Sequence, residues 1–462
     1  MPEQKRLDDF KLESKEDPGN FSTTGWLADG ELAHIMAEQE TDPRCANKIY
    51  QAEDVHEAAM RRINLVLDEF ETVYTSFSGG KDSTVLLHLL VQAAREKGKL
   101  PVRVLFIDLE AQYQATIQHV EEMIIGNPAV EAYWVALPLN LRNAVSIYQP
   151  QWVCWDAEVR EKWVREMPPH ACVINEKTMP PEWSAWFYKG MEFEEFIIKF
   201  GLWMRDKNAP GAMTAALIAI RADESLNRFL AVKDRKPEAT FAGHPWTTRI
   251  RKALYNAYPI YDWRTEDIWT AVGKFHLAYN KIYDLIFMTG RSIHETRICQ
   301  PYGDDQRQGL DLFRKVEPET WFKVVERVAG ANYGNIYRGL KILGNGQVVK
   351  PDEYTWREYA NFLLNTIPKW QAHVYRERID QFLAWWDAEE GWPRAEVPDA
   401  RLPRDDPRWL RPAGTRHRKT PSWERIAKCI LKNDLNCKTL SFGCVVGGYP
   451  RIQRLREQYG EW

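Results

Sequence analysis

The sequence predicts an α/β fold, a doubly wound and mostly parallel sheet of the Rossmann-like type, followed by a mostly helical C-terminal region. Three observations support this prediction. Apolar, strand-like runs alternate with helical segments between residues 53 and 137, and the alternation resumes at residue 215. A Gly-Gly turn joins the first predicted strand to the helix after it. From Pro318 onward, apolar residues recur mainly at helical spacing.

The elements of the N-terminal half follow from the spacing of apolar residues, which is three to four in a helix and continuous in a buried strand. The predicted helices are residues 53–70, 82–96 and 112–125, with a further helix after Asp223. The predicted strands are residues 72–77, 102–108, 132–137 and 215–221. Residues 140–210 are rich in Trp and Pro and have no clean period, which predicts an insertion or a lid.

Local signals place the C-terminal elements. Pro318 suits the first turn of a helix, and Thr355 with Glu358 has the pattern of a capping box. Gly344–Gly346 predicts a turn between two short strands. We therefore expect three parts, which are an acidic extension (1–45), an α/β domain (46–310) and a helical domain (311–462).

Composition excludes several classes of protein. The chain has 462 residues, of which 44% are hydrophobic and 27% charged, as is typical of a globular protein. No apolar run approaches the ~18 residues of a membrane span, and the N-terminus is charged, so neither a membrane protein nor a secretory signal is predicted. The seven cysteines form no Cys-x-x-Cys pair, which indicates a reduced, cytoplasmic protein without a cysteine-bound cluster.

The sharpest motif is the loop Ser78–Ser83, with the sequence SGGKDS, between a predicted strand and a predicted helix. Its two glycines allow a tight turn that directs backbone N–H groups at an anion, and the helix adds the positive end of its dipole. Lys81 contributes a positive charge, and the two serines contribute hydroxyl groups. The loop therefore predicts a phosphate site. It is not a Walker A loop, because Asp82 follows the lysine; Asp82 is instead a candidate Mg²⁺ ligand.

This loop resembles the SGGKDS segment of the phosphoadenosine phosphosulfate (PAPS) reductase family, which belongs to the ATP-pyrophosphatase class of adenine nucleotide alpha hydrolases. Three further segments are similar to motifs of that family and occur in the same order, namely Phe106–Glu110, Ile220–Arg228 and Pro259–Trp269. The resemblance covers about residues 50–300. It implies that ATP, with Mg²⁺ on its phosphates, binds at the carboxyl ends of the strands.

The resemblance also implies which residues form the site. The residues expected to bind the nucleotide are Ser78, Gly79, Gly80, Lys81, Asp82, Ser83 and Asp108. The residues expected to act in catalysis are Lys81, Asp82, Arg221, Glu224 and Arg228. Further segments, Cys299–Gln306 and Ile430–Asp434, resemble the immunoglobulin-binding regulator A proteins, which are often encoded beside a ParB-like protein. This second resemblance implies a ParB-like partner.

Three functions stay open at this stage. Adenylation is favoured: a nucleophile attacks the α-phosphate of ATP, pyrophosphate leaves, and the substrate is adenylated or thiolated. A sulfonucleotide reductase needs a nucleophilic cysteine in a Glu-Cys-Gly-[Leu/Ile]-His tail, which this chain lacks; its last cysteine, Cys444, has no neighbouring His. The third possibility is a nucleotide-binding regulator without catalysis that acts with a partner protein.

Some weaker features have two interpretations each. Asp108 either contacts the nucleotide or caps a helix, and Arg221 with Glu224 either belongs to the nucleotide site or forms a local ion pair. Five residues could in principle bind Zn²⁺, namely His294, Cys299, Cys429, Cys437 and Cys444. Their spacing matches no zinc pattern, so scattered buried thiols are favoured over a metal site. Seven aromatic residues of the Trp-rich stretch form either a lid that stacks on a base or part of the hydrophobic core. They are Trp152, Trp155, Trp163, Trp183, Trp186, Phe187 and Tyr188.

A basic segment occurs near the C-terminus. Residues 401–438 hold eleven Lys or Arg against four Asp or Glu, in a chain whose net charge is −3. Arginines alternate there with Trp409 and Trp423, which predicts contact with a polyanion, nucleic acid being the leading candidate. The alternative is an irregular strap that packs over the core, because prolines interrupt the segment.

Overall fold

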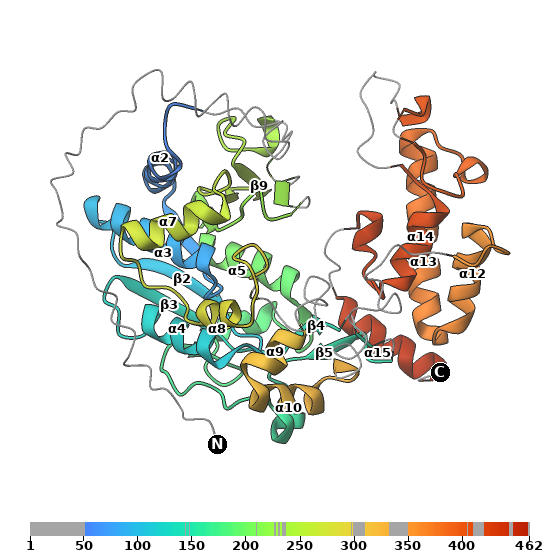
Figure 1. Cartoon of the computed structure of the whole chain (residues 1–462), viewed down its shortest axis with the longest axis horizontal. Helices are drawn as coiled ribbons and strands as arrows, with labels where there is room; N and C mark the ends of the chain where they lie inside the picture. The colour runs from blue at the N-terminus through green and yellow to red at the C-terminus, as the bar shows by residue number, and fades with distance from the viewer. Residues whose placement is uncertain are drawn as a thin grey trace. The chain divides into compact units, whose positions relative to one another are not determined.

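Seven strands form the central sheet in the order β6-β3-β2-β1-β8-β10-β9 in the computed structural model (Figure 1). The strands are β1 (Thr72–Ser76), β2 (Val102–Ile107), β3 (Val130–Val135), β6 (Val173–Ile174), β8 (Thr214–Ile218), β9 (Thr247–Arg251) and β10 (Leu254–Ala257). Neighbouring strands are parallel except for the antiparallel pair β9 and β10. The structure describes residues 51–143, 145–146, 148–208, 210–225, 228–229, 232, 237–296, 298, 310–331, 350–403, 405–409, 420–442 and 447–460.

The order of the strands reverses at β1. From β1 the chain moves outward to β2 and β3, and it then returns to β8 on the other side of β1. Ser76, the last residue of β1, pairs in register with Leu105 of β2 and Ile218 of β8. In an open α/β sheet, ligands bind beyond the carboxyl ends of the strands at such a switch point. The predicted doubly wound, mostly parallel sheet is therefore confirmed.

Eight helices accompany this sheet in the described part of the chain. They are α2 (Val55–Glu69), α3 (Lys81–Glu96), α4 (Gln114–Ile124), α5 (Phe193–Asn208), α7 (Thr265–Lys274), α8 (Ile282–Met288), α9 (Leu310–Val316) and α10 (Pro318–Arg327). Helices α2, α3 and α7 lie side by side, and α5 contacts β8 and β10 (Figure 1). Sheet and helices share one hydrophobic core, which extends from Ala59 to Ala331 and includes α9 and α10.

The predicted elements of the N-terminal half agree with the structure to within a few residues. Strand β8 ends at Ile218, three residues earlier than predicted, because the chain turns there and the Ile220 N–H bonds to the Ile218 carbonyl at 2.8 Å. The antiparallel hairpin of β9 and β10 was not predicted. The helix expected after Asp223 lies largely outside the described residues.

The stretch predicted as an insertion or lid forms a second, three-stranded sheet in the order β5-β4-β7. Its strands are β4 (Leu139–Arg142), β5 (Gln151–Val153) and β7 (Met191–Glu192). Trp183 is fully buried, and its ring lies 5.2 Å from that of Trp186 and 5.1 Å from that of Trp203. All seven aromatic residues considered for a lid are buried in the core or pack against it. The core interpretation is therefore correct.

The C-terminal region contains α12 (Trp356–Thr366), α13 (Lys369–Glu390), α14 (Trp423–Leu431) and α15 (Gly448–Tyr459). These helices share a second hydrophobic core that begins at Trp356. The capping box is confirmed, since Thr355 Oγ1 accepts from the Glu358 N–H at 3.1 Å and Glu358 accepts from the Thr355 N–H at 2.8 Å. Pro318 begins α10 as predicted.

Two expectations concern residues that the structure does not describe, namely the acidic extension 1–45 and the turn at 344–346. Among the described helices, none combines the length and the apolar character that crossing a membrane requires.

Candidate functional site

The glycine loop follows β1 and turns sharply at Gly79. This residue has a positive φ of 70°, and a Cβ atom there would lie 2.9 Å from methyl groups of Thr116 and Val120 in α4. The loop therefore packs against α4 at a point where only glycine fits. The buried Asn280 side chain donates to the Gly79 carbonyl at 2.8 Å and to the Thr116 hydroxyl at 3.0 Å, which ties the turn to α4.

Helix α3 begins directly after this turn, with Gly80 as its N-cap. Gly80 has no side chain to cap the first N–H groups of the helix. The Ser83 and Thr84 hydroxyls donate to the Gly80 carbonyl at 3.0 and 2.9 Å, and Ser83 Oγ accepts from the Ser78 N–H at 3.2 Å. These bonds fix a loop whose backbone leads into the N-terminus of a 16-residue helix, the arrangement that suits an anion.

Three charged residues form a chain behind the loop. Arg221 Nε donates to Asp82 Oδ1, and Lys81 Nζ lies 3.2 Å from Asp82 Oδ2. The Lys81 side chain is buried, and its ammonium lies 5.5 Å from the centre of the Tyr283 ring. Arg221 is only 2% exposed, and its NH1 has no hydrogen-bond partner within the described part of the chain. Two cations around one carboxylate leave a net positive charge beneath the loop.

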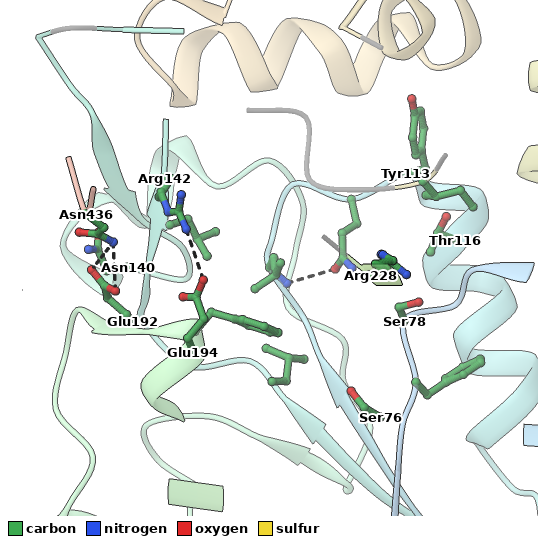
Figure 2. Close-up of a pocket in the computed structure, with 17 residues that line it drawn as sticks. Ser76, Ser78, Tyr113, Thr116, Asn140, Arg142, Glu192, Glu194, Arg228 and Asn436 are labelled. Atoms are coloured by element: carbon green, nitrogen blue, oxygen red, sulfur yellow. Dashed lines mark hydrogen bonds and ion pairs between the residues drawn. The ribbon is translucent and has the colours of Figure 1, made fainter. Parts of the chain in front are cut away.

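A cavity of about 480 Å³ opens beside the loop at the carboxyl ends of β1 and β2 (Figure 2). The residues from the sheet, the loop and α4 that line it are Ser76, Phe77, Ser78, Ile107, Leu109, Gln112, Tyr113 and Thr116. The residues that line it elsewhere are Asn140, Leu141, Arg142, Glu192, Phe193, Glu194, Arg228, Ile298 and Asn436. Its volume is in the range of sites for small molecules.

The structure brings two of the predicted site residues to the cavity wall, Ser78 and Arg228. Arg228 forms an ion pair with Glu224, four residues before it. Arg221 pairs with Asp82 rather than with Glu224, so the local ion pair considered as an alternative is replaced by a long-range one. The rest of the glycine loop and the charged chain lie next to the cavity without lining it.

Asp108 does not reach this cavity. It follows β2 as predicted, but it is fully buried, with Oδ2 accepting from the Trp134 indole at 2.9 Å and Oδ1 accepting from Arg165. The N-cap of the following helix is Tyr113, so the capping interpretation of Asp108 is wrong. Asp108 is part of a structural ion pair, and the nucleotide contact expected of it is not supported by its position.

Asp82 does not fit the role of a Mg²⁺ ligand in this arrangement. Both of its oxygens already contact cations, Arg221 and Lys81. Within the ranges that the structure describes, no group of three or more His, Cys, Asp or Glu side chains has the spacing of a metal site. A Mg²⁺ ion that arrives on the phosphates of a nucleotide is part of the substrate.

A second wall of the cavity was missed by the sequence interpretation. It consists of Asn140 and Arg142 from β4, Glu192 from β7, Glu194 from the first turn of α5, and Asn436 from the segment after α14. Burial, together with the nearby Glu194, raises the pKa of Glu192 to about 7. No sequence pattern joins these residues, because they belong to separate short elements. The only sequence feature that pointed to this wall was indirect: most of its residues lie in the Trp-rich stretch 140–210, which has no regular period.

The motif at residues 259–269 forms contacts that hold two parts of the fold together. Arg62 of α2 donates to the Pro259 carbonyl at 2.8 Å and forms two bonds with the Asp262 carboxylate, at 2.8 and 2.7 Å. The Trp263 indole donates to the Val55 carbonyl at 2.9 Å. These contacts attach the N-terminal helix to the segment that precedes α7, and none of these residues lines the cavity.

The four described cysteines are Cys154, Cys172, Cys429 and Cys437, and none of these four lines the cavity. Burial raises the pKa of Cys154 and of Cys429, which favours the thiol over the thiolate. This agrees with the prediction of scattered buried thiols. Cys299 and Cys444 lie outside the described residues.

The structure describes part of the basic segment 401–438, and several of its charged side chains form ion pairs within the chain. Arg408 pairs with Asp406, Lys428 with Glu424 and Lys438 with Glu194, so several of its charges are neutralised within the chain. The Arg425 guanidinium is partly buried and donates to the Thr439 carbonyl at 2.9 Å. Residues 404 and 410–419 lie outside the described ranges. Contact with nucleic acid stays a prediction, as does the ParB-like partner.

Comparisons with known proteins agree with this architecture. A model of the phosphoadenosine phosphosulfate reductase domain matches residues 72–179, from β1 onward, and a model named "Domain of unknown function (DUF3440)" matches residues 290–400. A 66-residue stretch, 14% of this chain, is 41% identical to sulfate adenylyltransferase subunit 2 of Mycolicibacterium gilvum, of which it covers 21%.

Two solved structures are similar over a large part of the chain. The PAPS reductase of Candida auris has 13% identity and a TM-score of 0.25, with 56% of this chain and 93% of that chain covered. The U34-tRNA thiolase NcsA of Methanococcus maripaludis has 11% identity and a TM-score of 0.28, with 64% and 83% covered.

The similarity to one bacterial protein spans nearly both chains. The uncharacterized protein YbdN of Escherichia coli (strain K12) is 37% identical over 416 residues, which are 88% of this chain and 96% of YbdN. The reductase-domain match begins at the strand that precedes the glycine loop. The chain therefore belongs to the same family as YbdN, and its residues 72–179 match the phosphoadenosine phosphosulfate reductase domain.

Proposed function

We propose that this protein is an ATP-pyrophosphatase-type enzyme, which binds ATP across the Ser78–Ser83 loop and adenylates or thiolates an acceptor with release of pyrophosphate. One observation carries the proposal. A two-glycine turn leads into the N-terminus of α3, where the N-cap Gly80 has no side chain and the Lys81 N–H donates to the Tyr283 hydroxyl at 2.9 Å, at the carboxyl end of β1 and beside a cavity of about 480 Å³. Backbone N–H groups at such a position are suited to a phosphate chain.

Each charged residue near the loop has a part in the proposed reaction. Attack at the α-phosphate moves negative charge onto the departing pyrophosphate, so fixed cations near the loop favour the transition state. Lys81 and Arg221 supply this charge, and Asp82 holds both of them in place. Arg228 lies on the cavity wall, where it can follow the reacting phosphate. Glu224 orients Arg228 through their ion pair.

The buried thiols favour adenylation over sulfonucleotide reduction. A reductase of that kind needs a reactive thiolate close to the nucleotide, and none of the four described cysteines lines the cavity, with raised pKa values at Cys154 and Cys429. The direct test is incubation with PAPS and reduced thioredoxin. Adenylation predicts no release of sulfite, and release that is lost in Cys444→Ala would support the reductase instead.

Binding of ATP is the first test of the proposal. Titration calorimetry with ATP and Mg²⁺ should detect binding to the full chain that is lost in Gly80→Asp. Aspartate is a favourable N-cap, so this variant is expected to fold, while its carboxylate repels the phosphates. The matched control is Gly98→Asp, at a left-handed glycine with no atom within 4 Å of the new Cβ. Equal ATP affinity in the two variants would contradict the proposal.

A further inference from the structure

The wall of the cavity that faces away from the glycine loop is built from paired strands. Asn140 of β4 and Glu192 of β7 are directly opposite each other in a parallel pair. Both side chains line the cavity, although the residues are only 5% and 3% exposed. Figure 2 shows them together on one side, whereas Ser78 and Thr116 lie on the other. The cavity therefore has two chemically different sides.

The C-terminal region completes this wall. Asn436, which is 4% exposed, donates from Nδ2 to both carboxylate oxygens of Glu192, at 3.0 and 3.2 Å (Figure 2). Asp434 fixes the turn that carries Asn436, since its carboxylate accepts from the N–H groups of Lys438 at 3.1 Å and Thr439 at 2.6 Å. The position of the Glu192 carboxylate is thus set by two bonds from a residue 244 positions away in the sequence.

Two cations and a second carboxylate lie near Glu192. Glu194 from α5 contacts Arg142 of β4 at 3.4 Å, and it also forms an ion pair with Lys438 from the C-terminal region. Burial acts against ionisation of Glu194, but Lys438 and Arg142 lower its pKa, so it stays charged. Glu192 is more deeply desolvated and titrates close to neutral pH. The Tyr188 hydroxyl, which bonds to Glu195, is a further titratable group nearby.

A hydrogen-bond acceptor beside Glu192 is unused. Asn140 Oδ1 is buried and has no hydrogen-bond partner among the residues that the structure describes. Native proteins seldom leave such an oxygen unpaired unless a ligand or water supplies the donor. The wall thus presents two neighbouring acceptors, Asn140 Oδ1 and the Glu192 carboxylate. A neutral NH₂ group on a ligand has two N–H donors and can therefore donate to both.

We propose that Asn140, Glu192 and Asn436 form the subsite for the acceptor of the reaction, and that this acceptor is a neutral primary amine whose proton passes to Glu192. The inference rests on the proposed function and names its substrate class. The nitrogen lone pair forms the N–P bond at the α-phosphorus of ATP. The bond to the bridging oxygen breaks, and its electron pair leaves with pyrophosphate. The proton lost by the nitrogen is taken up by a Glu192 oxygen.

The experiment uses the full-length protein with ATP, Mg²⁺ and hydroxylamine, a small nucleophile whose NH₂ group is largely neutral at pH 7.5. Pyrophosphate release is measured with hydroxylamine and with N,N-dimethylhydroxylamine, which lacks N–H groups. The variants are Glu192→Gln and Asn140→Ala. Their control is Glu195→Gln, a neighbouring buried glutamate that lies outside the cavity lining. ATP affinity is measured on each protein by calorimetry.

We expect hydroxylamine, but not its dimethyl form, to accelerate release. Glu192→Gln should lower the accelerated rate by about 100-fold, the usual contribution of a general base, with ATP affinity kept within a factor of two. Glu195→Gln should retain the wild-type acceleration. The wild-type rate should rise with pH through about 7, and this rise should be absent in Glu192→Gln.

The outcomes separate the two proposals. If wild type binds ATP but neither the NH₂ probe nor Glu192→Gln changes the rate, the subsite is wrong and ATP binding stands. An equal loss in Glu195→Gln would also overturn it, because a general loss of buried charge would then explain the effect. If wild type does not bind ATP, the proposed function fails, and the subsite fails with it.

Discussion

The guanidinium of Arg221 donates to the carboxylate of Asp82, although the two residues are 139 positions apart in the sequence. Asp82 is in the first turn of α3 after β1, and Arg221 follows β8, the strand on the other side of the switch point. The ion pair therefore joins the two loops that flank the candidate nucleotide site. It brings the SGGKDS motif and the motif at residues 220–228 together in the structure.

Breaking this pair should destabilise the fold. We expect Arg221→Ala to lower the free energy of unfolding by about 3 kcal/mol, because a nearly buried cation is removed and Asp82 loses one of its two partners. The measurement is equilibrium unfolding in urea. Arg394→Ala is the control, since Arg394 pairs with Asp380 at an exposed position and should cost less than about 1 kcal/mol. Similar losses in both variants would show that the pair is not structural.

The turn at Gly79 should not tolerate a methyl group. In Gly79→Ala the new Cβ would lie 2.9 Å from Thr116 and Val120, so α4 must shift, and we expect a loss of about 2 kcal/mol of stability together with weaker ATP binding. Gly98→Ala is the matched control, because Gly98 has a similar φ of 65° but open space around it. If urea unfolding gives the same loss of stability for both variants, the loss comes from the positive φ alone and not from the contact with α4.

Glu192 should make the fold less stable as pH rises. Its pKa is about 7 in the folded protein against 4.5 for a free side chain, so the folded state holds the proton more tightly than the unfolded chain. Between pH 4.5 and 7 the free energy of unfolding should therefore fall, by up to about 3 kcal/mol from this group. Glu192→Gln should remove that decline, which is measurable by urea unfolding at pH 5 and pH 8.

Glu194 provides a comparison of opposite sign. Lys438 and Arg142 lower its pKa against the effect of burial, so its stabilising contribution is present above its unfolded pKa and is lost as pH falls through the folded value. Glu194→Gln should therefore cost more stability at pH 8 than in acid. A pH profile identical in shape for both variants would contradict the assignment of charge in this wall.

The contact between Arg62 and Asp262 should matter for stability and not for nucleotide binding. Asp262→Ala leaves the buried Arg62 guanidinium with the Pro259 carbonyl alone, and we expect a loss of about 2 kcal/mol. ATP affinity of the folded variant should be unchanged, because this pair is outside the cavity lining. Asp68→Ala, which breaks a more exposed pair with Lys97, is the control. A large fall in affinity would place this motif in the site.

The glycine loop and the helices beside it were predictable because their signals are local. Gly79 and Gly80 mark the turn, the apolar residues of α2 recur on one helical face, and those of α3 form a long apolar run. Pro318 and the Thr355 capping box also act within a few residues. In each of these places the local preference of the chain and the final structure agree.

Which face of the sheet the Asp108 side chain lies on could not be predicted in the same way. Strand β2 is buried on both faces, so it has no alternation of polar and apolar residues that would tell which side a residue faces. Its partner Arg165 is 57 residues away, in a stretch without helical or strand period. The wall at Glu192 was missed for a related reason, since the signal would have to join β4, β7 and Asn436.

The bonds from Asn436 to Glu192 span 244 residues, which has a consequence for the order in which the molecule is made. At roughly 5–20 residues per second, the ribosome reaches Asn436 some 10–50 seconds after Glu192. Once Ala257 has been added, the nascent chain contains the glycine loop and the seven strands of the central sheet, but not the amide that holds the glutamate. The phosphate loop is thus synthesised well before the opposite wall is complete, and a chain stalled within α13 would contain the residues that line the cavity except Asn436.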